Sequence, residues 1–312
     1  MPDIDFRIER FSAGHLPALT ALYHAVYNRH APQDYFEKKY DTAYTGKQFI
    51  GYIAYAPDGV AAGYYGVIPC MMLYNGEIIA AAQSADTMTH PGYRLQGMFV
   101  ALSERTFALC RQEGISLLFG FPNQNSLHGA IHKLGWQLSH TMNAFHLPIR
   151  TLPLGRLGSK PGFAGKMYRL YCALILTKYR TSLRGIPSSV QENGYGTVHR
   201  SEAYLQQHAY SDHFVLRIGG VYVWMKTGTA MIVGDMETDR HSFSKTIHRL
   251  KRLARWLGTT EIRFQVSDGT QLHELLSQQS DPVPAFPVLF QQFAEGIDIK
   301  KFRFTFADID IF

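Results

Sequence analysis

One stretch near residue 90 constrains the fold of this chain more than any other. An apolar run over 78–88 ends at His-Pro-Gly (90–92), and the period becomes helical beyond Gly97, with Phe99 and Leu102 on one face. Proline and glycine at such a place are typical of the end of a strand. The sequence therefore predicts a strand, a basic turn that contains glycine, and then the start of a helix.

This turn has the composition of an anion site. The first residues of a helix carry backbone N–H groups without intrahelical partners, at the positive end of the helix dipole. Gly97 permits a close approach of a ligand to the backbone, and Arg94 adds a fixed positive charge. The pattern predicts a site for a pyrophosphate, with an ordinary strand-to-helix turn as the alternative.

Two motifs in fixed order resemble the GCN5-related N-acetyltransferase (GNAT) superfamily. The first is Arg-Leu-Gln-Gly-Met-Phe over 94–99, which is similar to the acetyl-CoA loop Gln/Arg-x-x-Gly-x-Gly/Ala. Phe99 departs from that loop, because the family has a small residue there. The second motif runs from an Asn-containing helix start over 121–126 to Lys-Leu-Gly-Trp over 133–136. The resemblance covers residues 4–147 and implies a domain that binds acetyl-CoA.

The resemblance also assigns the cofactor contacts. It implies that the strand end pairs with the pantetheine arm, that the loop holds the pyrophosphate, and that a helix residue lies beside the pantetheine. The expected acetyl-CoA-binding residues are Met88, Thr89, His90, Arg94, Leu95, Gln96, Gly97, Met98, Phe99 and Asn125. We expect no metal, because none of the 14 histidines stands in zinc-type spacing with a cysteine.

The sequence offers several candidates for the catalytic groups. The family often carries a tyrosine as general acid where this chain has Ile131, so His128 or His132 is a candidate, with exposed helix histidines as the alternative. Asp86, on the strand before the loop, is a candidate base or a hydrogen-bonding group of the strand end. The terminal carboxylate of Phe312 is a second candidate base, since some related multi-domain enzymes use that group; an exposed chain end is the alternative.

The predicted elements follow the order of a GNAT domain and then partly repeat it. Up to residue 147 the pattern predicts a strand, two helices, three antiparallel strands, helix, strand, helix and strand. After residue 198 the elements resemble a second, degenerate GNAT-like α/β domain. We therefore expect an α+β protein with a mixed, mostly antiparallel central sheet flanked by helices. The expected segments are a GNAT domain over 1–147, a basic linker with an amphipathic helix over 148–197, and a degenerate domain over 198–312.

The second half differs from the first in its counterpart of the phosphate loop. That segment is Asp-Met-Glu-Thr-Asp-Arg over 235–240, which is acidic and contains no glycine. An anion would be repelled there. We infer that the second half is structural or helps to shape a substrate cleft.

The positive charge of the chain is concentrated in one region. The net charge is +6, and residues 114–191 contain no Asp or Glu, while 150–184 contain eight Lys or Arg. A helix predicted over 166–183 has three interpretations. It packs against both domains with its basic stripe in water, it rests through 166–184 on an anionic membrane, or it forms a basic rim that helps to hold the CoA phosphates.

Composition excludes several classes of protein. Hydrophobic residues make up 46% of the chain and charged residues 18%, which is typical of a folded protein. Three widely separated cysteines are expected to be reduced core residues. Without a basic-then-apolar leader or a long apolar run, we expect a cytoplasmic protein with no membrane span. The basic stretch lacks aromatics on a strand platform, so we expect no nucleic-acid partner. The sequence does not specify an oligomeric state.

Together these features predict an acyl-CoA-dependent N-acyltransferase. It would transfer acetyl from acetyl-CoA to the primary amine of a small molecule or amino sugar by direct attack. The alternative is a GNAT fold without catalysis that binds CoA or a protein partner, and Ile131 and Phe99 favour that alternative. Fold analogy does not identify the acceptor.

Overall fold

The computed structural model describes residues 5–32, 34–158, 162–208 and 210–312. The chain divides into two compact units that interleave along the sequence. Unit 1 contains Met1–Ser139, Ser201–Tyr210 and Pro287–Lys300, and unit 2 contains His140–Arg200, Ser211–Phe286 and Lys301–Phe312. The sequence predicted three consecutive segments, over 1–147, 148–197 and 198–312. No local pattern in the sequence predicts that the two units interleave.

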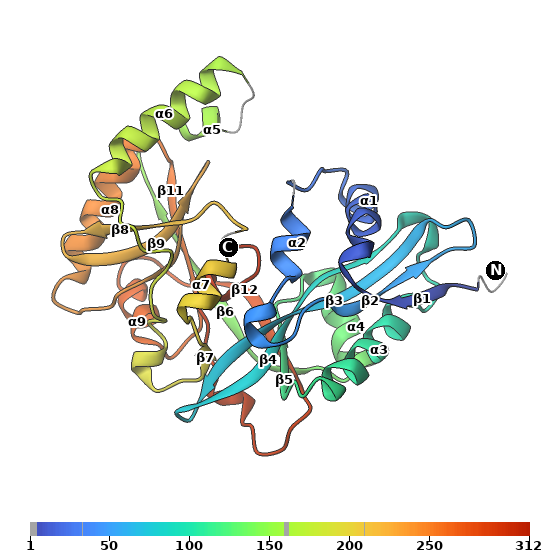
Figure 1. The fold of residues 1–312 in the computed structure, drawn as a ribbon. Helices are drawn as coiled ribbons and strands as arrows, with labels where there is room; N and C mark the ends of the chain where they lie inside the picture. The colour runs from blue at the N-terminus through green and yellow to red at the C-terminus, as the bar shows by residue number, and fades with distance from the viewer. Residues whose placement is uncertain (1–4, 33, 159–161, 209) are drawn as a thin grey trace. The chain divides into compact units, whose positions relative to one another are not determined.

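Unit 1 is built on a mixed sheet with the strand order β1-β2-β3-β4-β5-β12 (Figure 1). Neighbouring strands pair antiparallel, except that β4 and β5 are parallel. The strands are β1 (Arg7–Arg10), β2 (Ile50–Tyr55), β3 (Ala61–Tyr74), β4 (Glu77–Thr89), β5 (Leu117–Gly120) and, through its residues 287–292, β12 (Val283–Gln292).

Helices cover both faces of this sheet. They are α1 (Leu16–Tyr27), α2 (Tyr35–Tyr40), α3 (Met98–Gln112), α4 (Gln124–Leu134) and α7 (Glu202–Gln207). Buried residues of α1 and α2 share a core with Tyr64, whereas buried residues of α3 and α4 share a core with Tyr65. Consecutive residues of a strand point to opposite faces. The helix pair α1 and α2 therefore lies on one face and the pair α3 and α4 on the other.

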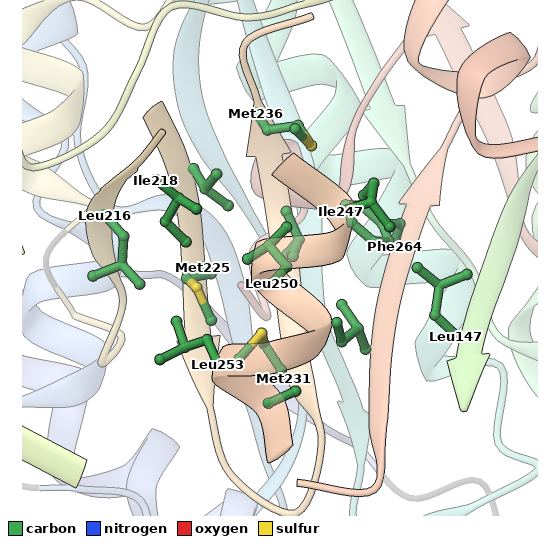
Figure 2. Close-up of a cluster of buried hydrophobic side chains, with 14 of the residues drawn as sticks. Leu147, Leu216, Ile218, Met225, Met231, Met236, Ile247, Leu250, Leu253 and Phe264 are labelled. Atoms are coloured by element: carbon green, nitrogen blue, oxygen red, sulfur yellow. The ribbon is translucent and has the colours of Figure 1, made fainter. Parts of the chain in front are cut away.

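The strands of unit 2 follow the order β6-β11-β10-β9-β8, and among these pairs only β10–β11 is parallel. Its strands are β6 (Gln137–Pro148), which belongs to unit 2 from residue 140 onward, β7 (Thr197–Val198), β8 (Phe214–Ile218), β9 (Val221–Thr227), β10 (Met231–Met236) and β11 (Glu261–Val266). Its helices are α5 (Gly155–Gly158), α6 (Phe163–Thr177), α8 (Phe243–Leu257) and α9 (Gln271–Ser277). Figure 2 shows Ile247, Leu250 and Leu253 of α8 packed among apolar side chains of the sheet.

The two units repeat one topological pattern. In unit 1 the parallel strands β4 and β5 are joined by α3, and in unit 2 the parallel strands β10 and β11 are joined by α8. The first strand of each pair contains a bulge, since the register shifts between Tyr64 and Gly66 opposite β4 and between Val233 and Asp235 in β10. The repeated pattern confirms the expectation of an α+β protein whose second half resembles the first.

The last strand of each half pairs in the other unit. β6 follows α4 along the chain but pairs antiparallel with β11 in unit 2. β12 follows α9 along the chain but pairs antiparallel with β5 in unit 1. Apolar alternation marks such segments as strands without specifying their partners, which is why sequence reasoning did not predict this exchange.

In two segments the structure differs from what the local sequence pattern indicates. Phe302, Phe304 and Phe306 alternate as in a strand and are all buried, yet the backbone there forms only isolated bridges and a short 3-10 helix, Phe306–Asp308. The second segment is the basic helix, whose apolar residues are packed in the first of its three interpretations. Leu170 and Leu174 of α6 are instead exposed, because the helix buries only its opposite face.

Candidate functional site

The strand β4 separates from β5 before it reaches the glycine loop. The two strands pair only through residues 81–83 of β4, although β4 continues to Thr89. On its other side β4 stays paired with β3, through a bulge between Ala85 and Met88. In the described part of the chain, the β5-facing backbone of residues 84–89 therefore has no neighbouring strand, and it is free to pair with an extended ligand.

The loop after β4 leaves the start of α3 open. Gly97 is the N-cap residue and is left-handed, with φ of 73°. Leu95 is also left-handed and its side chain is 99% exposed. The amide N–H groups of Met98 and Phe99, in the first helical turn, donate no hydrogen bond within the described residues. An anion at this point would meet unpaired amides at the positive end of the helix.

Arg94 supplies the positive charge of this loop. It is exposed, and among the described residues its guanidinium takes part in no ion pair or hydrogen bond. The turn before it is fixed locally, because the backbone N–H of Gly92 donates to Nδ1 of His90 at 3.1 Å. Arg94 can therefore turn toward a phosphate without breaking another interaction.

Two residues of the predicted loop are anchored in the core of unit 1. Met98 is buried, and its side chain fills the space beside Gly63 of β3. Phe99 packs against α4, where a Cβ at Gly129 would lie 3.2 Å from the Phe99 ring. The large residue that departs from the family pattern is thus accommodated by a glycine on the facing helix. Both residues can offer a ligand their backbone amides.

The remaining predicted cofactor residues differ in accessibility. Met88 is buried in the core on the α1 side, so its backbone is the available part. The N–H of His90 donates to the carbonyl of Ala62 at 2.8 Å. Thr89 and Gln96 are half-buried. Asn125 belongs to α4, and its side chain lies outside the described residues.

Asp86 lies in the β4 bulge and is held by two residues of α2. Its backbone is left-handed, with φ of 50°. Nζ of Lys39 lies 2.7 Å from one carboxylate oxygen, and the Tyr40 hydroxyl donates to the same oxygen at 2.9 Å. Burial, and next the charge of Asp86, raise the pKa of Tyr40 well above its usual range. These contacts support the interpretation of Asp86 as a hydrogen-bonding anchor; its role as a base stays a prediction.

The structure does not bring the candidate acids and Asp86 together. His128 and His132 lie side by side on the exposed side of α4, with ring centroids 4.4 Å apart. α4 packs on the α3 face of the unit 1 sheet, whereas Asp86 is bound by α2 on the other face. Ile131, at the position where the family often has tyrosine, packs against the α3-side core. The sheet thus separates the two predicted groups.

Phe312 belongs to unit 2 and its side chain is fully buried. Its ring stacks on His213, with centroids 5.8 Å apart, and meets Trp224 edge-on. A Cβ at Gly234 would collide with it, so the glycine in the β10 bulge makes room for this ring. The buried Phe312 side chain differs from the exposed chain end that was the alternative. The catalytic role of the carboxylate stays a prediction.

The start of α8, the counterpart of the α3 start, has a carboxylate of the protein beside it. The carboxylate of Asp239 accepts hydrogen bonds at 3.1 Å from the N–H groups of both His241 and Ser242. Hydrogen bonds from Ser242 and His241 lower the pKa of Asp239 below its usual value. The acidic loop thus places an anion of its own where a diphosphate would otherwise bind.

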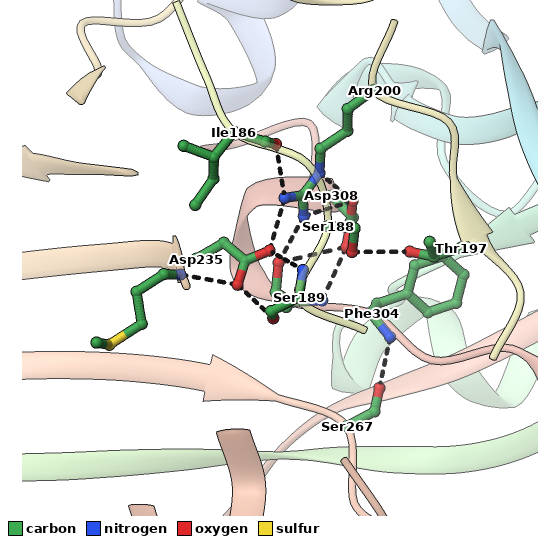
Figure 3. Close-up of polar contacts among 11 residues, drawn as sticks. Ile186, Ser188, Ser189, Thr197, Arg200, Asp235, Ser267, Phe304 and Asp308 are labelled. Carbon is green, nitrogen blue, oxygen red and sulfur yellow. Dashed lines mark hydrogen bonds and ion pairs between the residues drawn. The ribbon is translucent and has the colours of Figure 1, made fainter. Parts of the chain in front are cut away.

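A buried ion cluster beside the β10 bulge was not predicted. Asp235, expected in the acidic loop, is fully buried, which corrects that expectation. Figure 3 shows Arg200 between two carboxylates, with Nη1 2.6 Å from Asp235 and Nη2 2.9 Å from Asp308. Burial raises the pKa of Asp308, and the charge of Arg200 opposes that shift. The partners are more than thirty residues apart in sequence, so no local pattern signals them.

Two further findings bear on ligands. Among the residues that the structure describes, no three His, Cys, Asp or Glu side chains gather in a way that could hold a metal ion. The helices of the described ranges are all too short or too polar to cross a bilayer.

Comparisons with known proteins agree with this geometry. A family model described as "Acetyltransferase (GNAT) domain" matches residues 7–139. A comparison with curated protein sequences gives no significant match. Among solved structures, the chain is similar to a GCN5-related N-acetyltransferase from Kribbella flavida, with 12% identity and a TM-score of 0.60 over 93% of this chain and 71% of the other.

Two more solved structures share this fold. A GCN5-related N-acetyltransferase from Anabaena variabilis has 14% identity and a TM-score of 0.57 over 92% of this chain and 73% of the other. Eis1 from Mycobacterium abscessus has 13% identity and a TM-score of 0.51 over 92% of this chain and 73% of the other. These similarities span both units. Residues 7–139 therefore form a GNAT acetyltransferase domain, within a chain whose whole fold is that of GNAT proteins.

Proposed function

We propose that this protein is an acyl-CoA-dependent N-acyltransferase that uses acetyl-CoA and acts on the primary amine of a small molecule. The observation that carries the proposal is the open start of α3, directly after a strand that has left its parallel neighbour. Unpaired amides and Arg94 suit the pyrophosphate, and the unpaired edge of residues 84–89 suits the pantetheine amides.

The chemistry follows from this orientation. A neutral amine attacks the thioester carbon, the C–N bond forms, the C–S bond breaks, and the thiolate leaves as CoA after taking up a proton. Backbone N–H groups near the β4 bulge would stabilise the negative charge on the carbonyl oxygen. Holding both reactants in place supplies much of the rate acceleration.

The test is isothermal titration with CoA, using two glycines at opposite ends of α3. Gly97 and Gly114 are both left-handed, with φ of 73° and 70°, and a Cβ at either position meets open space. Gly97→Glu and Gly114→Glu therefore impose similar backbone strain, but only the first places a carboxylate at the proposed pyrophosphate site. We expect Gly97→Glu to weaken CoA binding by roughly tenfold or more, about 1.4 kcal/mol.

The control decides the interpretation. Gly114→Glu should bind CoA as the unaltered protein does. Equal loss in both variants would indicate damage to α3, and undiminished binding in Gly97→Glu would contradict the proposed site.

One observation favours a second function, a CoA-binding module without catalysis. The sheet of unit 1 separates His128 and His132 from Asp86, so the predicted acid and base do not face one another. Release of free thiol from acetyl-CoA, measured across a panel of amines, distinguishes the two functions. Turnover with any amine supports the transferase, and CoA binding without turnover across the panel supports the module.

A further inference from the structure

The helix α6 (yellow-green in Figure 1) carries two apolar faces on opposite sides. The inner face packs Cys172 and Leu176 into the core of unit 2. The outer face carries large apolar side chains with exposed fractions of 79% for Phe163, 55% for Leu170 and 68% for Leu174. A helix at the surface of a globular protein normally carries one apolar stripe, so the outer face needs a separate explanation.

The exposed residues form one continuous row. Phe163, Met167, Leu170 and Leu174 follow the spacing i, i+4, i+7 and i+11, which places them along one side of a helix. All four are exposed, and Tyr171 borders the row at 42% exposure. A contiguous apolar surface of this kind marks an interaction site.

The apolar surface continues onto the end of α8. The Tyr171 hydroxyl donates to the carbonyl of Trp256 at 2.7 Å, which fixes α6 beside the last turn of α8. Trp256 is 45% exposed, and Leu152, which follows Thr151, is 73% exposed. The Thr151 hydroxyl donates to the carbonyl of Arg255 at 3.0 Å, so this segment lies at the same helix end. We call the α6 row, Tyr171, Trp256 and Leu152 together the apolar ridge.

The described charged residues of α6 and α8, the helices that carry the apolar ridge, are all positive. Residues 114–191 contain no Asp or Glu, and neither does α8. Exposed cations occur on both elements that carry the ridge, namely Lys166, Arg169, Lys178, Arg252 and Arg255. Lys166 and Lys178 lie on the flanks of the α6 row by helical spacing. An apolar surface on helices that carry cations and no carboxylates is complementary to a surface that is apolar inside and anionic outside.

We propose that the apolar ridge rests on the surface of an anionic lipid bilayer. Phe163, Leu170 and Leu174 enter the boundary between headgroups and acyl chains, and Trp256 lies at the headgroup level, as interfacial tryptophans do. Lys166 and Lys178, on the flanks of the row, contact lipid phosphates. This binding places α6 parallel to the membrane, and it does not depend on the proposed transferase activity.

Tryptophan fluorescence of the full chain tests the proposal directly. The protein has three tryptophans, of which Trp136 and Trp224 are buried and Trp256 is exposed. Vesicles rich in phosphatidylglycerol should shift the emission to shorter wavelength and protect it from acrylamide, and Trp256→Phe should remove both effects. Pure phosphatidylcholine vesicles or high salt should weaken them, because the attraction to anionic lipid is screened.

Flotation with the same vesicles tests the ridge by mutation. Leu170→Gln combined with Leu174→Gln should reduce the vesicle-bound fraction by about tenfold, because two apolar anchors are lost. The matched control is Ile78→Gln combined with Leu138→Gln, two exposed apolar residues of unit 1 with fractions of 47% and 52%. Thermal unfolding of each variant confirms that it is folded.

Three outcomes overturn the proposal. They are absence of binding to anionic vesicles at low salt, equal loss of binding in the ridge and control variants, and self-association through the same surface. The last would appear in light scattering as a dimer that Leu170→Gln with Leu174→Gln abolishes, and it would show that a second copy of the chain covers the ridge.

Discussion

The starts of α3 and α8 occupy the same place in a repeated topology and have opposite chemistry. Each helix follows a bulged strand and leads to that strand's parallel neighbour. At α3 the loop offers Gly97, two amides and an arginine, Arg94, that have no partner among the described residues, whereas just before α8 the carboxylate of Asp239 accepts the amide hydrogens of His241 and Ser242. Topology therefore supplies a helix end in both units, and a few loop residues decide whether a foreign anion can bind there.

The two bulges show the same contrast in their aspartates. The side chain of Asp86 is 14% exposed, and it pairs with one cation, Lys39. The side chain of Asp235 is fully buried, and it shares the cation Arg200 with Asp308. In unit 2 the aspartate of the bulge thus belongs to a buried ion cluster with a structural role. Unit 1 keeps its bulge at the point where a ligand would reach the sheet.

The largest expected effect is a loss of stability when the buried ion cluster of unit 2 loses its arginine. Arg200→Met leaves two buried carboxylates without their cation and should lower the free energy of unfolding by about 3–5 kcal/mol. Lys39→Met should cost less, because Asp86 keeps partial access to water and the Tyr40 hydrogen bond. Urea denaturation measures both. Arg217→Met, an exposed arginine of β8, is the control and should change stability little; equal costs for the first two variants would refute the contrast between the bulges.

The next effect concerns the open helix end. Arg94→Ala should weaken CoA binding by about tenfold, near 1.4 kcal/mol, because one charge-assisted contact to phosphate is lost. Isothermal titration measures the change. Arg105→Ala removes an exposed arginine from the same helix away from its start and should leave the affinity unaltered. If both variants bind equally well, the loop does not hold the diphosphate through this side chain.

A smaller effect distinguishes the two interpretations of Asp86, a hydrogen-bonding anchor and a catalytic base. Asp86→Asn weakens the attraction to Lys39 and should lower the free energy of unfolding by about 1–3 kcal/mol. An anchor leaves the pH profile of kcat/KM in its original shape, since no titrating catalytic group is removed. Loss of one limb of that profile, with stability intact, would identify Asp86 as the base and would show that the anchor interpretation is wrong.

The smallest expected effect is a pH dependence of the Tm that comes from Asp239, just before α8. The pKa of Asp239 is lowered in the folded protein, so its ionised form stabilises the fold above the ordinary value of 3.8, and this contribution is lost as the pH falls through the folded pKa. Asp239→Asn should therefore lower the Tm at neutral pH, and the difference from the unaltered protein should vanish in strong acid. Thermal unfolding across pH measures this. A difference that is constant with pH would mean that the charge is not involved.

Sequence reasoning predicted the order of elements and the helix start after β4, because period changes, turn residues and glycine are local signals. It did not predict the contacts between distant segments. Nothing in the sequence joins Lys39 to Asp86, or Arg200 to Asp308, since buried ion pairs depend on the folded arrangement. The accommodation of Phe99 by Gly129 is of the same kind, because each residue looks unremarkable without the other.

The basic helix shows how a correct local prediction can leave the burial of its side chains undecided. The spacing in α6 identified a helix with apolar residues, and the helix is present. Apolar residues occur on two opposite faces, and sequence alone did not show which face the protein covers. The structure selected Cys172 and Leu176 for the interior and left Leu170 and Leu174 in water.

The exchange of final strands has a consequence for biosynthesis. The strand order of unit 1 is completed by residues 287–292, which leave the ribosome only after residues 1–286 have been made. Until then β5 is an uncovered, apolar sheet edge, the kind of surface that invites wrong pairing in a nascent chain. An expression fragment that stops near residue 139 keeps that edge permanently, so biochemical work on the acetyltransferase domain requires a polypeptide that extends through residue 292.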